Sequence, residues 1–306
     1  MSLIAPIFEL HDKSKFKIYL YSFGEKEDAF TERAKKSGCV FKNIKKLNDI
    51  ETVKLARKDK IDIAIDLMGY TKYNRFPIFS YRVAPIQINY LGYPGSLGSD
   101  EIDYIIADRI VIPNSHEKFY TEKIIRMPNC YLCTDDKMKI SKEKFSRKDF
   151  NLPEKAFVFT CFNGAKKITP NEFNIWMRLL KKIKGSVLWL KASNQATIDN
   201  LRIEAEKRNV DQNRIIFAYN IELSKHLARH SLGDLGLDTF NFNGCTTSSF
   251  GLWAGMPILT KIGESFPARM NASLLTALGI PELITYSEKE YEELALRLAN
   301  NPDELL

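Results

Sequence analysis

Short apolar runs alternate with longer amphipathic stretches through the second half of this chain. Short apolar runs predict buried strands, whereas apolar residues that recur every three or four positions predict helices. The expected strands are 157–161, 187–191, 215–218, 235–238, 257–260 and 282–285. The expected helices are 170–184, 195–209, 224–230, 246–254, 268–278 and a last helix that starts at Ser287. Because strands alternate with helices, we predict a parallel sheet that helices cover on both faces.

The first half of the chain shows the same alternation less completely. The expected helices are 3–10, 30–37 and 49–59, with Asp49 as a candidate cap. The expected strands are 16–21, 61–67, 84–90, 104–107 and 124–127, and 40–41 is expected to lead into a connection. The strand and loop that would open a doubly wound domain are not found here. We therefore expect the domain formed by this half to be incomplete.

The segment 134–148 is rich in Lys and Asp and contains few apolar residues, which is typical of a linker. The chain has 306 residues, enough for two α/β domains with cores of their own. We predict a partial N-terminal Rossmann-like domain over residues 1–140. A more complete C-terminal Rossmann-like domain is predicted over residues 149–306.

The composition is that of an ordinary globular protein, with 44% hydrophobic and 27% charged residues. The net charge is +7, but the lysines are scattered in short pairs without a nucleic-acid recognition motif. A small phosphate-bearing ligand explains a local basic cleft equally well, so we expect no nucleic-acid partner. No apolar run approaches the roughly 20 residues of a membrane span, and no leader peptide is apparent. We therefore expect a cytoplasmic protein with no membrane partner.

Five cysteines, an odd number in a long chain, do not indicate a disulfide framework. Cys130 and Cys133 have C-x-x-C spacing, but a zinc site would need a second pair. A chance occurrence is favoured over a redox pair. The acidic pairs Asp100-Glu101 and Asp135-Asp136 lack matching partners after convincing strands, so no metal is expected.

Candidate chemistry follows three of the expected strands. Lys167 comes after 157–161, and His226 and Arg229 share one face of the helix after 215–218. Thr246 and Thr247 begin the helix after 235–238. The carboxyl ends of parallel strands meet at one edge of a sheet, and a helix N-terminus there suits a phosphate. Taken singly, the lysine and the His/Arg pair are more typical of a solvated face, and the threonines fit a plain capped helix equally well.

In order and context, these features resemble the catalytic region of the O-linked N-acetylglucosamine transferases and their SPINDLY-like relatives, glycosyltransferase family 41. The resemblance covers nearly the whole chain and is carried by Gly69–Lys72, Ala84–Gly95, Met127–Asn129, Lys167–Pro170, Ser186–Leu190, Asn243–Thr247 and Leu252–Pro257. It implies the GT-B architecture, in which two Rossmann-like domains face each other across the active site.

The resemblance also implies roles for particular residues. Lys167 is implied to be the catalytic lysine that stabilises the leaving nucleotide diphosphate, so that neither a metal nor a cofactor is required. The other implied substrate-binding residues are Gly164, Ile221, Leu223, His226, Arg229, Cys245, Thr246 and Thr247 around the nucleotide, and Tyr70, Leu91 and Pro94 on the sugar and acceptor side. Tyr70 and Lys72 could equally just finish a strand.

Several positions depart from the family pattern. Cys245 stands where many members have a histidine, and Phe250 stands where they have a carboxylate that meets the ribose. Gly164 replaces a side chain that usually touches the nucleotide. The acceptor-side histidine motif would fall just before residue 1, and neither His11 nor His116 matches it. We therefore expect a fragment or a diverged short member of the family.

The leading hypothesis is an inverting, metal-independent glycosyltransferase that moves a sugar from a nucleotide diphosphate donor, UDP-N-acetylglucosamine by resemblance, onto protein Ser or Thr. Asparagine or a non-protein acceptor is an alternative. A second hypothesis is a catalytically impaired module that binds nucleotide or protein. A third is another GT-B transferase or a nucleotide-sugar epimerase.

Overall fold

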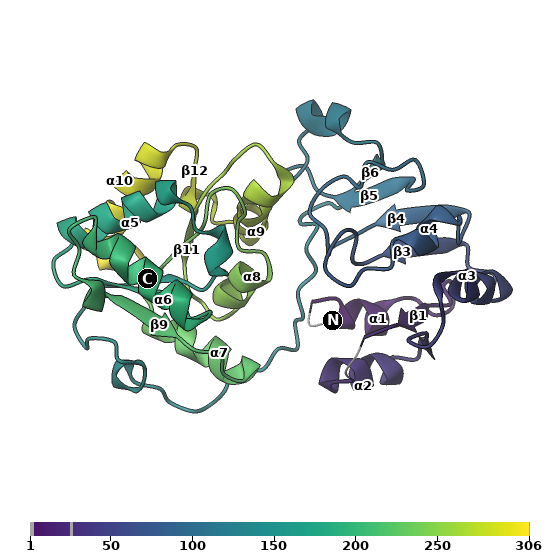
Figure 1. The fold of residues 1–306 in the computed structure, drawn as a ribbon, viewed down its shortest axis with the longest axis horizontal. Coiled ribbons are helices and arrows are strands. Elements are labelled where there is room, and N and C mark those ends of the chain that lie inside the picture. Colours follow the sequence, from purple (N-terminus) through teal and green to yellow (C-terminus); the bar gives the residue numbers. More distant parts are fainter. Residues whose placement is uncertain (1–2, 25–26, 306) are drawn as a thin grey trace. The chain divides into compact units, whose positions relative to one another are not determined.

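The computed structural model describes residues 3–24 and 27–305. The chain separates into two compact units, Met1–Lys137 and Met138–Leu306. The predicted domain limits, 1–140 and 149–306, differ from these units in the segment 138–148, which groups with the second unit. Each unit is described by itself below, and Figure 1 labels most of the helices and several strands of both.

The second unit is built on a six-stranded sheet with the order β12-β11-β10-β7-β8-β9, and every neighbouring pair is parallel. Its strands are β7 (Val158–Cys161), β8 (Val187–Lys191), β9 (Ile215–Ala218), β10 (Leu235–Leu237), β11 (Ile258–Lys261) and β12 (Ile284–Thr285). The order reverses direction on either side of β7, as in doubly wound folds. The carboxyl ends of β7 and β10 therefore lie side by side.

Helices cover both faces of this sheet, because successive strand residues point to opposite sides. They are α5 (Pro170–Lys182), α6 (Gln195–Glu206), α7 (Leu223–Arg229), α8 (Thr246–Trp253), α9 (Met270–Leu278) and α10 (Glu288–Asn300). Phe159 joins a core cluster with residues of α5 and α10, whereas Val158 joins a cluster around Trp189. Thr169 and Glu172 form a capping box that starts α5 ahead of its buried Trp176.

The first unit contains two separate parallel sheets. The larger has the order β3-β4-β5-β6, and the smaller pairs β1 with β2. The strands are β1 (Tyr19–Ser22), β2 (Val40–Asn43), β3 (Ile63–Asp66), β4 (Ile86–Asn89), β5 (Tyr104–Ala107) and β6 (Lys123–Arg126). The helices are α1 (Ala5–Leu10), α2 (Ala29–Lys36), α3 (Asp49–Lys58) and α4 (Pro77–Ser80). Ala64 of β3 packs against α3 and α4, whereas Ile106 of β5 packs against α1.

The predicted α/β class with parallel sheets is confirmed, two local expectations in the first unit are corrected, and one short helix is additional. Residues 40–43 form a strand that pairs with β1, rather than a connection. The N-cap of α3 is Asn48, whose side chain accepts from the Glu51 N–H, rather than Asp49. The short helix α4 was not predicted. Among the described residues, the helices are too short or too polar to cross a membrane.

Candidate functional site

Lys167 lies at the carboxyl edge of the second sheet, at the end of a short turn that follows β7. Its Nζ donates to the backbone oxygen of Asn243 at 2.8 Å and lies 4.1 Å from the centre of the Phe242 ring. Burial lowers the pKa of this lysine below its ordinary value. Among the described residues no carboxylate forms an ion pair with it. The ammonium is therefore partly desolvated and held by a carbonyl and an aromatic ring, which leaves its charge available to an anion.

His226 and Arg229 lie on α7 and contact each other directly. Arg229 Nε donates to His226 Nδ1 at 3.0 Å, and Arg229 Nη1 donates to the Tyr219 carbonyl at 2.7 Å. Burial and the Arg229 charge lower the pKa of His226 to about 4, so the ring is neutral near pH 7. Because its Nδ1 accepts a hydrogen bond, the proton is on Nε2, which becomes a donor.

The guanidinium of Arg229 is enclosed by aromatic rings. Arg229 is only 3% exposed, and its guanidinium carbon lies 5.2–6.0 Å from the ring centres of Phe150, Phe162 and Trp189. Burial lowers its pKa to about 10, so it stays charged at neutral pH. This burial argues against a merely solvated helix face.

The helix α8 begins at Thr246, as the sequence predicts. Its N-cap is Cys245, whose side chain makes no capping hydrogen bond, and Thr246 and Thr247 are half-buried. The first backbone N–H groups of a helix have no partner within the helix and give this end a positive potential. Lys167 bonds Asn243 in the loop that leads into α8, and the ring of Phe250 on α8 lies 6.5 Å from that of His226. These contacts bring the lysine, the histidine–arginine pair and the threonines to one edge of the sheet.

A buried aspartate that the sequence analysis did not single out supports this edge. Asp238 follows β10 and is fully buried. Its donors at 2.7–3.0 Å are the side chains of Asn163, Thr260 and Asn271 and the backbone N–H groups of Thr239 and Gly244. Burial raises its pKa to about 6, against the effect of these donors. The carboxylate thus ties the loops after β7 and β10 together beneath Lys167 and α8. The sequence signal that could have identified Asp238 is an acidic residue directly after an apolar strand.

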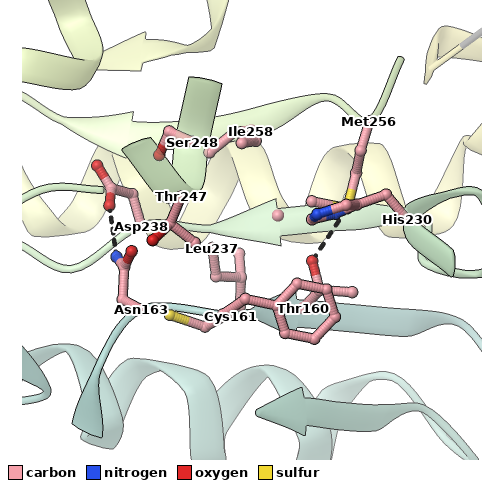
Figure 2. Close-up of a pocket in the computed structure, with 12 residues that line it drawn as sticks. Thr160, Cys161, Asn163, His230, Leu237, Asp238, Thr247, Ser248, Met256 and Ile258 are labelled. Atoms are coloured by element: carbon pink, nitrogen blue, oxygen red, sulfur yellow. Dashed lines mark hydrogen bonds between the residues drawn. The ribbon is translucent and has the colours of Figure 1, made fainter. Parts of the chain in front are cut away.

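A small cavity lies behind Thr247. It measures about 20 Å³, enough for about one water, and lies among β7, β10 and the start of α8. Figure 2 shows His230 and Met256 at one end, with the Thr160 hydroxyl donating to the Met256 sulfur, and Asp238 with Asn163 at the other. Both ring nitrogens of His230 are buried without a hydrogen-bond partner among the described residues. Burial lowers the pKa of His230 to about 3, so the ring is neutral.

The remaining candidates of the second unit lie on loops of the same edge. Gly164 precedes the turn that ends at Lys167, and a Cβ built on it meets no atom within 4 Å. Ile221 is 38% exposed in the loop between β9 and α7, and Leu223 begins α7. The open space at Gly164 is consistent with a ligand approaching the backbone there. The binding roles of these residues stay predictions.

The candidates Tyr70, Leu91 and Pro94 belong to the first unit and form a group of their own. Tyr70 follows β3, and its hydroxyl donates to the Leu97 carbonyl at 2.7 Å. Leu91 follows β4 with φ of +76°, a left-handed conformation that is unusual for leucine. Pro94 lies in the turn from Tyr93 to Gly95. The ring centre of Tyr93 lies 5.5 Å from that of Tyr70. These residues are thus held at the carboxyl ends of two neighbouring strands.

A parallel sheet whose carboxyl edge presents cations and a helix N-terminus is typical of nucleotide-binding α/β domains. The comparisons with known proteins agree. The family model of glycosyl transferase family 41 matches residues 1–145 and 134–306, so the chain belongs to that family.

The relatives that the chain resembles are named as protein glycosyltransferases. The Arabidopsis thaliana protein SEC, a probable UDP-N-acetylglucosamine–peptide N-acetylglucosaminyltransferase, is 34% identical over 99% of this chain. SPINDLY of the same plant, which carries the same enzyme name, is 31% identical over 95%. The chain spans about a third of the length of these relatives, 32% of each.

Solved structures confirm the GT-B fold. A mutant of the Thermobaculum terrenum O-GlcNAc transferase matches with a TM-score of 0.91 and 28% identity, covering 99% of this chain and 57% of that one. A putative UDP-N-acetylglucosamine 2-epimerase from Listeria monocytogenes matches with a TM-score of 0.52 at 9% identity, over 99% of this chain and 85% of that one. The second match reflects the shared fold alone.

Proposed function

We propose that this chain is the catalytic region of an inverting, metal-independent glycosyltransferase. It would transfer N-acetylglucosamine from UDP-N-acetylglucosamine to a serine or threonine hydroxyl of a protein, and the proposed compartment is the cytoplasm. The donor and acceptor class come from the names of the similar proteins. The observation that carries the proposal is the Lys167 ammonium, which is desolvated, has no acidic partner among the described residues and lies against the loop that starts α8.

The chemistry follows from where charge develops. The acceptor hydroxyl oxygen forms a bond to the anomeric carbon and releases its proton to solvent. The bond from that carbon to the phosphate oxygen breaks in the same step, and this displacement inverts the carbon. UDP leaves with an additional negative charge. Lys167 and the N–H groups at the start of α8 stabilise that charge, because they are positioned before the reaction begins. His226 would donate from Nε2 to the nucleotide, with its tautomer set by Arg229.

The central test replaces the lysine and compares it with its neighbour. Lys167→Ala should weaken UDP binding by about 10- to 100-fold, the range of a lost charge-assisted hydrogen bond, and should abolish transfer. Lys166→Ala is the matched control, because Lys166 is exposed and adjacent in sequence. Calorimetric titration of both variants with UDP measures the difference. Equal affinities would refute the role of Lys167, and loss of transfer in EDTA would refute metal independence.

A second candidate function is a binding module without turnover. The ring of Phe250 favours it, because this apolar side chain lies beside His226 and cannot accept hydrogen bonds from a ribose. Incubation with UDP- and GDP-sugars distinguishes the two functions. Release of free nucleotide supports the transferase, whereas binding without release supports the module.

A further inference from the structure

Asp66 and Asn89 end two neighbouring parallel strands in the first unit. They are direct register partners of β3 and β4, and both are buried, at 6% and 0% exposure. Register partners on adjacent strands point to the same face, with their Cα atoms about 4.8 Å apart. This is the face on which Ala64, two residues before Asp66, packs against α3 and α4. The two polar side chains therefore lie next to each other in a desolvated layer.

Each side chain has one oxygen that no donor in the described part of the chain satisfies. Asp66 Oδ1 accepts from the backbone N–H groups of Met68 and Gly69 at 2.9 and 3.0 Å, and Asn89 Nδ2 donates to the Gly95 carbonyl at 3.0 Å. Asp66 Oδ2 and Asn89 Oδ1 are buried without a hydrogen-bond donor among the described residues. Rotating the Asn89 amide does not help, because its oxygen would then face the Gly95 carbonyl. Two adjacent buried acceptors are unfavourable unless a donor lies between them.

A single proton satisfies both atoms. We propose that Asp66 is a neutral carboxylic acid whose Oδ2 hydroxyl donates to Asn89 Oδ1, and that this bond joins the bases of the loops that follow β3 and β4. Burial also raises the pKa of Asp66, and only the two backbone N–H groups oppose that rise. Three cations near this layer form ion pairs elsewhere: Arg75 with Asp49, Arg82 with Asp103 and Lys42 with Asp59. The segments that follow β3 and β4 also contain other titratable side chains, and none of them is a cause of the shift. They are Tyr70, Lys72, Tyr73, Tyr90, Tyr93, Asp100 and Glu101.

The proton would act by positioning the candidate acceptor side, and in this respect the inference rests on the proposed function. Tyr70 is on one of the joined loops, and Leu91 and Pro94 are on the other. The loops also interlock, because a Cβ on Gly92 would lie 2.2 Å from the Leu67 carbonyl oxygen. Asp66 and Asn89 are thus positioning residues that hold the two loops in register.

Asp108 provides a matched control within the same sheet. It is also buried, at 1% exposure, and follows β5 in a similar turn. Its Oδ1 accepts from the N–H groups of Ile110 and Val111 at 2.8 and 2.9 Å, and its Oδ2 accepts from the Tyr131 N–H at 2.7 Å. Both oxygens of Asp108 therefore accept hydrogen bonds, whereas one oxygen of Asp66 has to donate one.

The two aspartates should therefore respond oppositely to amide substitution. Asp66→Asn keeps one accepting oxygen and offers an N–H₂ group to Asn89, so its thermal midpoint at pH 7 should equal or exceed that of the wild type. Asp108→Asn turns an N–H₂ group toward the Tyr131 N–H, so its midpoint should fall. A fall of similar size in Asp66→Asn would overturn the proposal and indicate an ionised Asp66 bridged by water or a cation.

A pH series and infrared spectra test the proton itself. An acid with a raised pKa binds more protons in the folded chain, so the wild type should lose stability relative to Asp66→Asn as pH rises from about 4 toward the folded pKa. The difference spectrum of wild type minus Asp66→Asn at pH 7 should contain the carbonyl band of a protonated carboxyl group. Parallel pH profiles and a carboxylate band in its place would exclude the neutral acid.

The positioning role needs a kinetic readout. Asn89→Leu removes both the acceptor for Asp66 and the donor to Gly95, and should raise the KM for a peptide acceptor while UDP affinity stays unchanged. Asp66→Asn should keep the wild-type KM. An unchanged KM in Asn89→Leu would refute positioning. The stability and infrared results do not depend on catalysis, so they hold or fail separately from the transferase assignment.

Discussion

The carboxyl edges of the two sheets each contain a buried aspartate, but the two are satisfied differently. In the second unit, Asp238 receives donors from side chains and backbone on several segments, so both of its oxygens are covered. In the first unit, Asp66 receives two backbone N–H groups on one oxygen and, within residues 3–24 and 27–305, no donor on the other. The second edge is thus held by a network of side chains, whereas the first is held by backbone turns and, as we propose, by one proton.

This difference indicates how rigid each edge is. A carboxylate that joins several loops loses many hydrogen bonds at once if one loop moves, which favours a preformed site. The loops after β3 and β4, joined by a single hydrogen bond between side chains, would separate at a lower cost in free energy. Under the proposed function, the second edge would be a preformed donor side and the first a more adaptable acceptor side.

The largest expected effect comes from breaking the Asp238 network. Asp238→Leu would leave the donors around it unpaired in the interior, so we expect the free energy of unfolding to fall by about 3–5 kcal/mol. Thr260→Val removes only the donor at 2.8 Å and should cost about 1 kcal/mol. Urea unfolding of both variants measures the two losses. Equal losses would mean that Asp238 does not act as the centre of a network.

Acid should destabilise the second unit through its buried histidines. The pKa values of His226 and His230 are lowered to about 4 and about 3, so the unfolded chain binds more protons below pH 6.5. Each histidine therefore removes stability as pH falls from 6.5, by about 1.4 kcal/mol per pH unit until its folded pKa is reached. The raised pKa of Asp238, about 6, acts in the opposite direction between about pH 4 and 6.

His230→Leu isolates the histidine contribution. It removes two buried nitrogens that have no partner in the part of the chain that the structure describes. The variant should therefore be at least as stable as the wild type at pH 7 and more stable by about 2 kcal/mol at pH 5. Unfolding midpoints at both pH values provide the measurement. A difference that does not change with pH would mean that His230 is not kept neutral by burial.

Two glycines give a smaller contrast between the units. Gly92→Ala places a Cβ 2.2 Å from a backbone oxygen, so we expect a loss of about 1–3 kcal/mol as the loop after β4 is displaced. Gly164→Ala meets no atom within 4 Å and should change stability by less than about 1 kcal/mol. Thermal unfolding compares them. A neutral Gly92→Ala would show that the first-unit loops are not interlocked.

Much of this architecture could be predicted from the sequence because apolar runs specify buried parallel strands directly. Residues 187–191 and 215–218 are strands with the expected limits, and α8 begins at Thr246. Since parallel strands end at one edge, the proximity of Lys167 to the start of α8 followed from topology. The strand Val40–Asn43 was missed because it is short and only half-buried, so that its pairing with β1 decides its conformation.

Other features of the site could not be predicted, because they depend on loop packing. The ring of Phe242 lies under the Lys167 ammonium only because the loop after β10 folds back, and Thr239 Oγ1 donates to the Phe242 carbonyl within it. The burial of Arg229 depends on Phe150 and Trp189, which lie far from it in sequence. The hydrophobic periodicity of the sequence predicts which face of a helix or strand is apolar. It does not predict which charged side chain the core encloses.

The aromatic enclosure of Arg229 has a consequence for how a ligand arrives. Its hydrogen bonds go to a neutral imidazole and a carbonyl, and among the described residues no acid pairs with it. Water is largely excluded from around it, so its field extends outward with little screening. Folding alone therefore creates a standing electrostatic attraction for anions at this edge, and a compact polyanion would be drawn in before any contact with base or sugar forms.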